Sequence, residues 1–243
     1  MIISSFDNPV FYNISENIKV IRSEIAEAAI KSGRAADDVR LMAVTKTVSV
    51  DLINFAIQHC GIDLIGENKV QEFLSKKDSL LLEGVEKHLI GHLQTNKVKK
   101  IFNEVDMIQS VDSLKLAGVI SQESVKADKV SNILLEINVG SEESKTGFDK
   151  VAFFDALSQI SELPNICVKG IMTIPPICEN SCELEKYFEL MQGYYLDIAS
   201  KKYTNFDFEV LSMGMSGDYK EAVLHGSNLV RVGSAIFGAR IYK

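Results

Sequence analysis

Apolar runs of strand length alternate with longer amphipathic segments along the chain from residue 41 onward. Short runs rich in Val, Ile and Leu are typical of buried parallel strands. Eight such strands are expected at residues 41–45, 63–66, 88–91, 107–110, 133–139, 168–174, 209–213 and 229–233. Apolar residues recur with helical spacing in the segments between them, including 50–58, 70–82, 113–127 and 182–199.

This alternation predicts an α/β fold, because strands separated by helices form a parallel sheet through right-handed crossovers. Eight such units within 243 residues favour a closed (β/α)8 TIM barrel over an open doubly wound sheet, which is the alternative. A further helix is expected at residues 14–32, before the first strand. Since no linker rich in Pro, Gly or Ser divides the chain, we expect a single barrel domain over residues 1–243, with residues 1–40 as an N-terminal helical extension.

Composition narrows the class of protein. The net charge of −7 argues against nucleic acid as a partner, because phosphate binding requires a basic surface. The sequence contains neither an apolar stretch long enough to span a membrane nor a basic segment followed by an apolar leader. Cys60, Cys167, Cys178 and Cys182 have neither redox-motif nor zinc-ribbon spacing, which is typical of thiols in a reducing compartment. We therefore expect a cytoplasmic protein that binds neither nucleic acid nor membrane.

Lys46 is the first candidate for chemistry, because it directly follows the apolar run 41–45. In a barrel, this position lies on the carboxyl face of the strands, where active sites are found. A partly buried amine loses its proton readily and can then attack a carbonyl carbon. The alternative is a strand-end lysine whose ammonium group simply reaches solvent.

The loops after the seventh and eighth expected strands have the composition of a phosphate site. One contains Gly214, Ser216 and Gly217, and the other contains Gly233 and Ser234. Barrels often bind phosphate through these two loops, where glycines allow close approach and N–H groups face the anion. Ser216 and Ser234 could instead serve only as helix caps. The occurrence of both patterns in the two expected loops favours phosphate.

Arg231 alternates with Val230 and Val232 and therefore points to the opposite side of its strand. If the valines pack against helices, the arginine points into the barrel. There it either forms an ion pair with Glu136 or Glu209 or faces a ligand. Toward a pyridine nitrogen, a guanidinium would donate a hydrogen bond without protonating the ring.

Four further polar residues at the ends of strands allow two interpretations. His88 and His92 have the spacing of metal ligands on a helix, but the segment between them is predicted as strand and turn, so we expect no metal site. Asn68 follows the second expected strand and Asn138 lies near the end of the fifth. Either asparagine could be a loop cap or a ligand contact at the barrel mouth.

These segments together resemble the pyridoxal phosphate homeostasis protein family, formerly called proline synthetase co-transcribed proteins. That family is related in fold to the N-terminal barrel of alanine racemase. The matching segments occur in order at residues 43–46, 66–72, 88–97, 137–139, 143–147, 169–172, 211–216 and 231–238. One such segment would be weak evidence, whereas the ordered set is specific.

The resemblance implies that this chain binds pyridoxal 5′-phosphate (PLP). Lys46 would carry the cofactor as a Schiff base, and Arg231 would face its pyridine nitrogen. The phosphate would be held by Ser216, Gly233 and Ser234. The implied cofactor-binding set is Lys46, Asn68, Met213, Ser216, Arg231, Gly233 and Ser234.

Proteins of this family are regarded as cofactor carriers, so the resemblance implies intracellular PLP homeostasis without catalytic turnover, with PLP-dependent apoenzymes as partners. The alternative is a PLP-dependent racemase or related amino-acid enzyme, which needs a second acid/base group besides the lysine. In alanine racemases, this group is a tyrosine from an added C-terminal domain, and this sequence stops at Lys243, after the eighth unit. Tyr194, Tyr195 and Tyr219 have no context that indicates such a role. A lone barrel is expected to be a monomer.

A third interpretation is a phosphate-sugar enzyme that forms a Schiff base with its substrate. Such enzymes usually place the lysine on a late strand. The position of Lys46 after the first strand therefore argues against this class.

Overall fold

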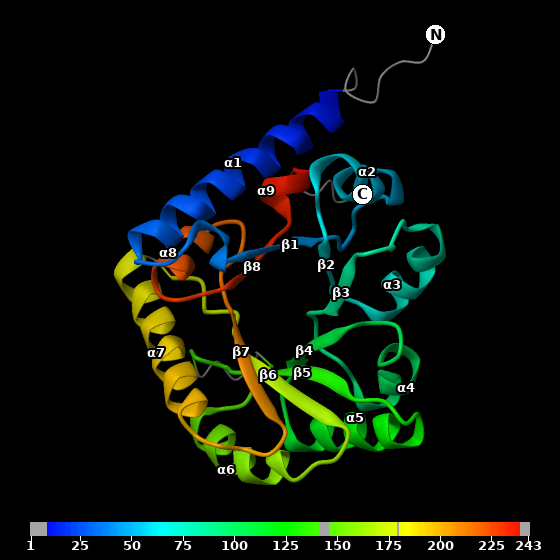
Figure 1. Cartoon of the computed structure of the whole chain (residues 1–243), viewed down its shortest axis with the longest axis vertical. Helices are drawn as coiled ribbons and strands as arrows, with labels where there is room; N and C mark the ends of the chain where they lie inside the picture. The colour runs from blue at the N-terminus through cyan, green and yellow to red at the C-terminus, as the bar shows by residue number, and fades with distance from the viewer. Residues whose placement is uncertain (1–8, 141–145, 179, 239–243) are drawn as a thin grey trace.

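The computed structural model describes residues 9–140, 146–178 and 180–238. Within them, eight parallel strands pair in sequence order and β8 pairs again with β1, so the sheet closes into a barrel (Figure 1). The predicted TIM barrel is confirmed, and the open sheet is wrong. The strands are β1 (Arg40–Val44), β2 (Leu64–Glu67), β3 (Glu86–Leu89), β4 (Met107–Val111), β5 (Ser131–Glu136), β6 (Ile166–Met172), β7 (Phe206–Ser212) and β8 (Leu229–Val232).

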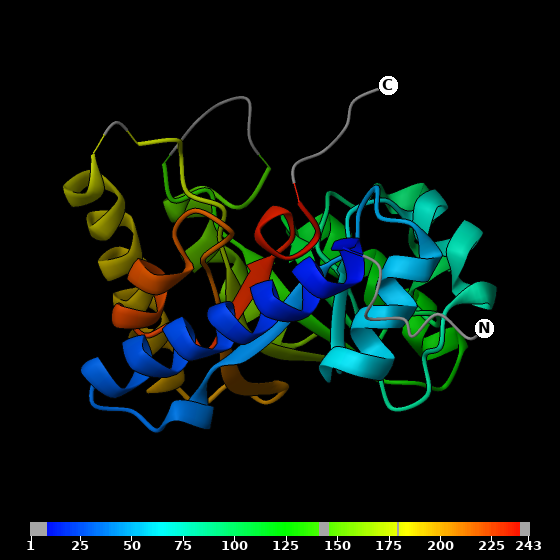
Figure 2. The same cartoon turned by 90° about the horizontal axis from the view of Figure 1, so that it is seen from above.

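Helices form an outer layer around the strands, as Figures 1 and 2 show. The α-helices are α1 (Pro9–Lys31), α2 (Val50–Cys60), α3 (Val70–Lys76), α4 (Val98–Ile101), α5 (Leu114–Lys126), α6 (Lys150–Ser161), α7 (Ser181–Ala199), α8 (Tyr219–Leu224) and α9 (Ser234–Phe237). The described residues also include the 3-10 turns η2 (Ala36–Asp38), η3 (Lys77–Ser79) and η4 (Thr95–Lys97). In the described part of the chain, no helix is both long and apolar enough to cross a membrane.

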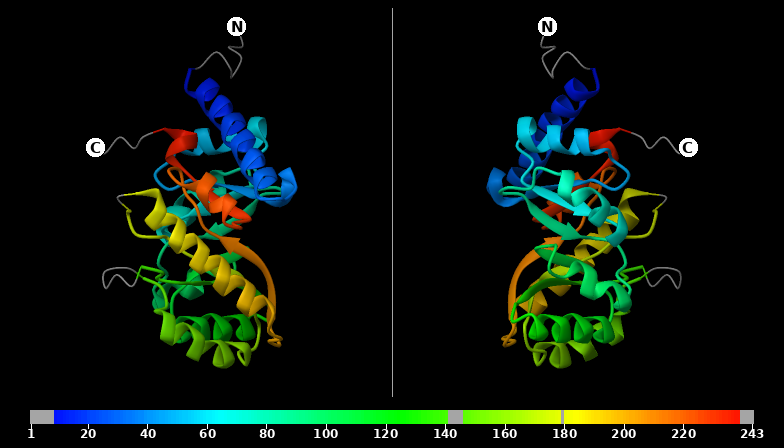
Figure 3. Two further views of the ribbon diagram at one scale, coloured as in Figure 1. Left: turned by 90° about the vertical axis from the view of Figure 1, so that its left-hand side faces the viewer. Right: turned by 90° about the vertical axis from the view of Figure 1, so that its right-hand side faces the viewer.

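The helix expected before the first strand is α1, which begins five residues earlier than predicted. It buries a stripe of Ile14, Ile18, Ile21 and Ile25, whose spacing places them on one face. That face packs against α2, α8 and α9. Figure 3 shows α1, α8 and α7 side by side along one side of the barrel. The N-terminal helix therefore completes the outer layer.

Of the element boundaries that differ from the predictions, two reflect contacts with residues distant in the sequence. The helix expected at 70–82 ends at Lys76 and continues as η3, because Leu80 adopts an extended backbone and is buried in the core. The strand expected at 133–139 ends at Glu136, beyond which Ile137 forms an isolated parallel bridge with Phe148. The backbone N–H of Ile137 still donates to the carbonyl oxygen of Met172, the last residue of β6. No disulfide joins the four cysteines, all of which lie in the described residues.

The interior of the barrel contains both apolar and polar layers. One apolar group comprises Met42, Val44, Leu64, Ile90 and Leu229, and another comprises Met107, Leu134 and Met172. Four polar side chains are buried inside the barrel with these groups and make hydrogen bonds with one another: His88, Gln109, Ser212 and Arg231. The polar layer is the feature of the fold that bears most directly on the candidate site.

Candidate functional site

Lys46 lies half-buried in the turn directly beyond β1. Ala43 pairs with Val232, so this end of β1 is adjacent to the end of β8. The next residue, Thr47, has a φ of 65°, a left-handed conformation that costs a non-glycine residue roughly 1–2 kcal/mol. Its backbone N–H donates to Oε1 of Glu72, which fixes this conformation. The turn that carries Lys46 is therefore held by a side chain of α3.

A buried ion cluster holds the backbone on both sides of Lys46. The Nζ of Lys76 donates to Oε1 of Glu67 (2.9 Å), Oε1 of Glu72 (2.7 Å) and the carbonyl oxygen of Thr45 (3.0 Å). The Thr45 hydroxyl also donates to Glu67, whose side chain is 1% exposed. Burial raises the pKa of Glu67, while Lys76 stabilises its charged form. We call these four residues, Thr45, Glu67, Glu72 and Lys76, the Lys76 clamp.

The loops after β7 and β8 meet at one hydroxyl group. Oγ of Ser216 accepts hydrogen bonds from the backbone N–H groups of Gly233 and Ala235, both at 3.2 Å. Ser216 therefore joins the two loops and does not cap α8, whose N-cap residue is Asp218. The Ser216 hydroxyl instead accepts from N–H groups at the start of α9, which is a capping contact with the helix of the next loop. Ser234 is exposed and begins α9.

Arg231 lies inside the barrel, as the alternation of its strand predicts. Val230 and Val232 pack in the outer core against the helices, while Arg231 is 3% exposed. Its Nη1 donates to Oγ of Ser212 at 2.6 Å, and its Nη2 donates to the carbonyl oxygen of Thr173 at 2.7 Å. Burial lowers the pKa of Arg231 to about 10, so the guanidinium stays charged at neutral pH.

Among the described residues, Arg231 forms no ion pair with either expected carboxylate. Glu209 pairs instead with Lys169 at 3.1 Å. Glu136 accepts a hydrogen bond from the Thr146 hydroxyl through Oε1, whereas its buried Oε2 has no hydrogen-bond partner. Burial raises the pKa of Glu136, and the charge of Arg231 acts on it in the opposite direction. The structural ion pair is therefore wrong, and Arg231 is held by neutral acceptors.

Asn68 lies half-buried directly after β2, at the barrel mouth. Its neighbour across the loops is Gly91. A Cβ at Gly91 would lie 2.1 Å from the Asn68 carbonyl oxygen and 2.7 Å from its Oδ1. Gly91 is therefore required for the position of Asn68.

Met213 follows β7, and its side chain is fully buried in the outer core. Its carbonyl oxygen accepts a hydrogen bond from the Ser227 hydroxyl at 2.7 Å. Since the side chain is part of that core, a ligand contact of Met213 would have to come from its main chain.

The two histidines with metal-ligand spacing have separate partners. His88 is inside the barrel between Glu86 and Gln109, whereas His92 lies on the surface with Nδ1 3.0 Å from Asp112. The described residues contain no group of three metal-ligating side chains.

The three tyrosines considered as second acid/base groups are buried or hydrogen-bonded to other parts of the protein. Tyr194 is buried in the outer core, and the Tyr195 hydroxyl donates to the carbonyl oxygen of Phe208. The Tyr219 hydroxyl donates to Glu24 of α1. Burial and this carboxylate raise the pKa of Tyr219, which makes its hydroxyl a weaker proton donor.

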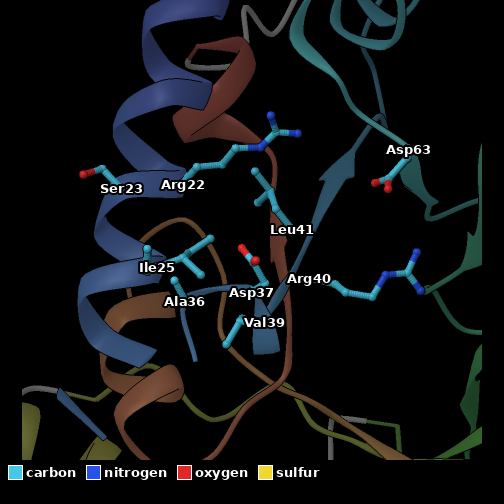
Figure 4. Close-up of a pocket in the computed structure, with 10 residues that line it drawn as sticks. Arg22, Ser23, Ile25, Ala36, Asp37, Val39, Arg40, Leu41 and Asp63 are labelled. Atoms are coloured by element: carbon cyan, nitrogen blue, oxygen red, sulfur yellow. The ribbon is translucent and has the colours of Figure 1, made fainter. Parts of the chain in front are cut away.

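A separate cavity of about 490 Å³ lies between α1 and the start of β1, at the amino-terminal end of the strand (Figure 4). Its two arginines already have partners. Arg22 donates to the carbonyl oxygen of Gly61, and Arg40 pairs with Glu86 at 2.7 Å. None of the predicted site residues lines this cavity.

The sequence predicted neither the Lys76 clamp nor the hydrogen bonds by which Ser216 joins the loops after β7 and β8. Glu67 and Glu72 do lie within the matching segment 66–72, so their presence there was a usable signal. The pairing of two backbone N–H groups with a hydroxyl from another loop has no sequence signature.

Comparison with known proteins first defines the class. Residues 13–241 match the family model described as alanine racemase, N-terminal domain. The alanine racemase of Clostridium difficile 630 aligns with a TM-score of 0.69 over 93% of this chain and 57% of that chain, at 14% identity. That likeness shows the shared barrel fold.

The curated relatives then define the family. The pyridoxal phosphate homeostasis protein of Aquifex aeolicus is 37% identical over 230 residues, which cover 95% of this chain and 100% of the relative. The Escherichia coli K12 protein of the same name is 33% identical over 233 residues, covering 95% and 98%. The chain belongs to the pyridoxal phosphate homeostasis protein family.

One solved structure of this kind contains the cofactor. PipY of Synechococcus elongatus PCC7942 with PLP bound has a TM-score of 0.77 and 30% identity to this chain. The alignment covers 88% of this chain and 100% of PipY.

Proposed function

We propose that this chain binds PLP and carries it in intracellular PLP homeostasis, with Lys46 as the covalent anchor through a Schiff base. The observation that carries the proposal is the meeting of three strand ends. Lys46 follows β1, beside the end of β8, and Ser216 connects the loop after β7 to Gly233 and Ala235. The names of the curated relatives and the PLP in PipY support the same ligand.

The chain's own groups fit the cofactor. Oγ of Ser216 accepts from the N–H groups of Gly233 and Ala235, which leaves the hydroxyl proton to be donated to a phosphate oxygen. Arg231 is buried, charged and held by neutral acceptors, so it can donate to a ring nitrogen. When bound, PLP supplies an aldehyde that condenses with an amine.

Each residue then has a distinct task. Lys46 binds the aldehyde carbon, while Ser216, Gly233 and Ser234 hold the phosphate. Arg231 donates to the ring nitrogen and keeps it unprotonated, which weakens the ring as an electron sink. Asn68 lies beside the ring, and Met213 contributes through its main chain.

Carriage without turnover is supported by the surroundings of these residues. Racemisation requires a second acid/base group opposite the lysine. The hydroxyls of Tyr195 and Tyr219 are engaged with Phe208 and Glu24, and Tyr194 is buried in the outer core. We propose a cytoplasmic monomer with one domain over residues 1–243, residues 1–40 being its N-terminal extension, and PLP-dependent apoenzymes as recipients of the cofactor.

The anchor is tested by borohydride reduction of the PLP-loaded protein, followed by peptide mass mapping. The expected result is cofactor mass on the peptide that contains Lys46 and its loss in Lys46→Ala. The matched control is Lys69→Ala, which removes an exposed lysine directly after Asn68. A protein that takes up no PLP, or that fixes it elsewhere, contradicts the anchor.

Carriage is tested separately by incubating the loaded protein with L-alanine in deuterated water. We expect no steady incorporation of deuterium at Cα. Continued incorporation with loss of optical purity would identify a racemase instead.

A further inference from the structure

A continuous chain of hydrogen bonds crosses the barrel interior from Arg231 to the opposite end of the strands. Nη1 of Arg231 is 2.6 Å from Oγ of Ser212, which is 2.8 Å from Oε1 of Gln109. Nε2 of Gln109 is 2.7 Å from Nδ1 of His88, and Nε2 of His88 is 2.6 Å from Oε1 of Glu86. We call these five residues the barrel relay.

The barrel relay is shielded from solvent along most of its length. Arg231, Ser212, Gln109 and His88 are each 3% exposed or less, whereas the Glu86 side chain is 31% exposed. Glu86 and His88 line a cavity of about 310 Å³ that also includes Arg40, where β1 begins. The relay therefore joins the proposed ring-nitrogen partner to the amino-terminal end of the barrel.

The chemistry of Arg231 determines the direction of every hydrogen bond in the relay. A guanidinium only donates, so the Ser212 oxygen accepts from it and the single Ser212 proton goes to Oε1 of Gln109. The amide nitrogen of Gln109 then faces His88, and Nδ1 of His88 must accept. The imidazole proton is thereby placed on Nε2, from which it is donated to the Glu86 carboxylate.

The far end of the relay is a stable acceptor. The hydrogen bond from His88, assisted by the pairing with Arg40, lowers the pKa of Glu86 to about 2. Glu86 is therefore a carboxylate at neutral pH and accepts from His88. A proton on Nδ1 of His88 would oppose the Gln109 amide, and turning that amide would leave the Ser212 proton without its Gln109 acceptor.

We propose that Ser212, Gln109 and His88 are positioning residues, which hold the Arg231 guanidinium in one orientation through a single proton arrangement anchored at Glu86. Because Arg231 meets the ring nitrogen only in the function proposed above, this inference rests on that function. Its consequence is that the ring environment of the bound cofactor depends on side chains that never contact the cofactor.

The proton arrangement is tested without cofactor, by 15N NMR of the imidazole groups in the full-length protein. The sequence has four histidines, and variants lacking His59, His92 or His225 assign the remaining signal to His88. We expect the neutral form with the proton on Nε2 at neutral pH. In Gln109→Glu, the new carboxylate accepts from Nδ1, so the His88 signal should change to the doubly protonated form. A proton on Nδ1 of the unmodified neutral ring contradicts the proposal.

The link to the cofactor is tested by the absorption spectrum and dissociation rate of bound PLP in Ser212→Ala and Gln109→Leu. We expect a displaced absorption band and about tenfold faster dissociation, equivalent to roughly 1.4 kcal/mol. The matched control is Ser124→Ala, which removes a buried hydroxyl of α5 that hydrogen-bonds to Ser131 outside the relay. That variant loses a buried hydrogen bond but should keep the spectrum and the rate.

Two results separate this inference from the proposed function. If unmodified protein binds PLP on Lys46 but both relay variants retain its spectrum and dissociation rate, the positioning role is wrong and the carrier function stands. If unmodified protein binds no PLP, the proposed function fails, and with it the role of the relay toward the cofactor. A variant that does not fold leaves the NMR measurement on unmodified protein to decide the proton arrangement.

Discussion

The Nζ of Lys76 lies 3.0 Å from the carbonyl oxygen of Thr45, the residue immediately before the proposed anchor. The same ammonium group binds Glu72, which in turn accepts from the backbone N–H of Thr47. Lys76 therefore holds the main chain on both sides of Lys46, directly at Thr45 and through Glu72 at Thr47. The position of Lys46 depends on α3 as much as on its own strand.

Lys76→Met should destabilise the protein and weaken cofactor binding. Removal of the ammonium group leaves Glu67 buried without its cation, which costs about 3–5 kcal/mol for a buried pair. Chemical denaturation measures this loss, and titration with PLP measures the weaker binding. The control is Lys77→Met, which removes a surface pair with Glu104 and should change the midpoint little. Equal effects in the two variants would contradict the clamp.

Gly91→Ala should displace Asn68 and lower stability by about 1–3 kcal/mol, the usual cost of overpacking. The added Cβ would lie 2.1 Å from the Asn68 carbonyl oxygen, so the backbone of one of the two residues would have to shift. Gly118→Ala provides a control of opposite sign, since Gly118 is inside α5 and its Cβ would meet nothing within 4 Å. That variant should gain about 0.5–1 kcal/mol. Thermal unfolding compares the pair.

Ser216→Ala should weaken binding of PLP by about tenfold, the effect of losing one hydrogen bond of roughly 1.4 kcal/mol to a charged group. Pyridoxal lacks the phosphate, so its binding should be nearly unchanged. Absorption titrations with the two compounds make the comparison, with the exposed Ser200→Ala as control. Equal losses for both compounds would place Ser216 away from the phosphate.

Glu86 should make stability depend on pH in acid. Its folded-state pKa of about 2 lies below the ordinary value of 4.5, so its contribution is fully present above pH 4.5 and is lost as pH falls toward 2. The difference in unfolding free energy between unmodified protein and Glu86→Gln should therefore shrink over that range. Urea denaturation at several pH values measures it, with the exposed Glu83→Gln as control. A constant difference from pH 6 to pH 3 would contradict the lowered pKa.

Periodicity along the sequence was sufficient for the barrel and for the direction of Arg231. The eight apolar runs predicted eight strands, and the alternation of Arg231 with two valines predicted its buried side. Strand ends were less predictable, since the fifth strand stops at Glu136, where the chain turns into the bridge from Ile137 to Phe148. The local pattern of apolar and polar residues does not reveal a tertiary pairing of this kind.

The polar contacts of the site could not be predicted for a related reason. The Lys76 clamp joins β1, β2 and α3, and its function depends on a long side chain reaching an acceptor in another element. Gln109 and Ser212 are polar residues inside apolar runs, which was a signal of inward burial. Their hydrogen bond spans 103 residues, so neither side chain's partner could be identified from its neighbours.

The closure of the sheet has a consequence for the proposed carrier, which would exist both with and without PLP. Every strand of the barrel has two hydrogen-bonded neighbours, so loading and unloading uncover no strand edge on which another chain could add. The middle of the barrel is filled by the protein's own side chains rather than by the ligand. The closed sheet and the side chains that fill it therefore form one packed unit to which a ligand contributes no contact.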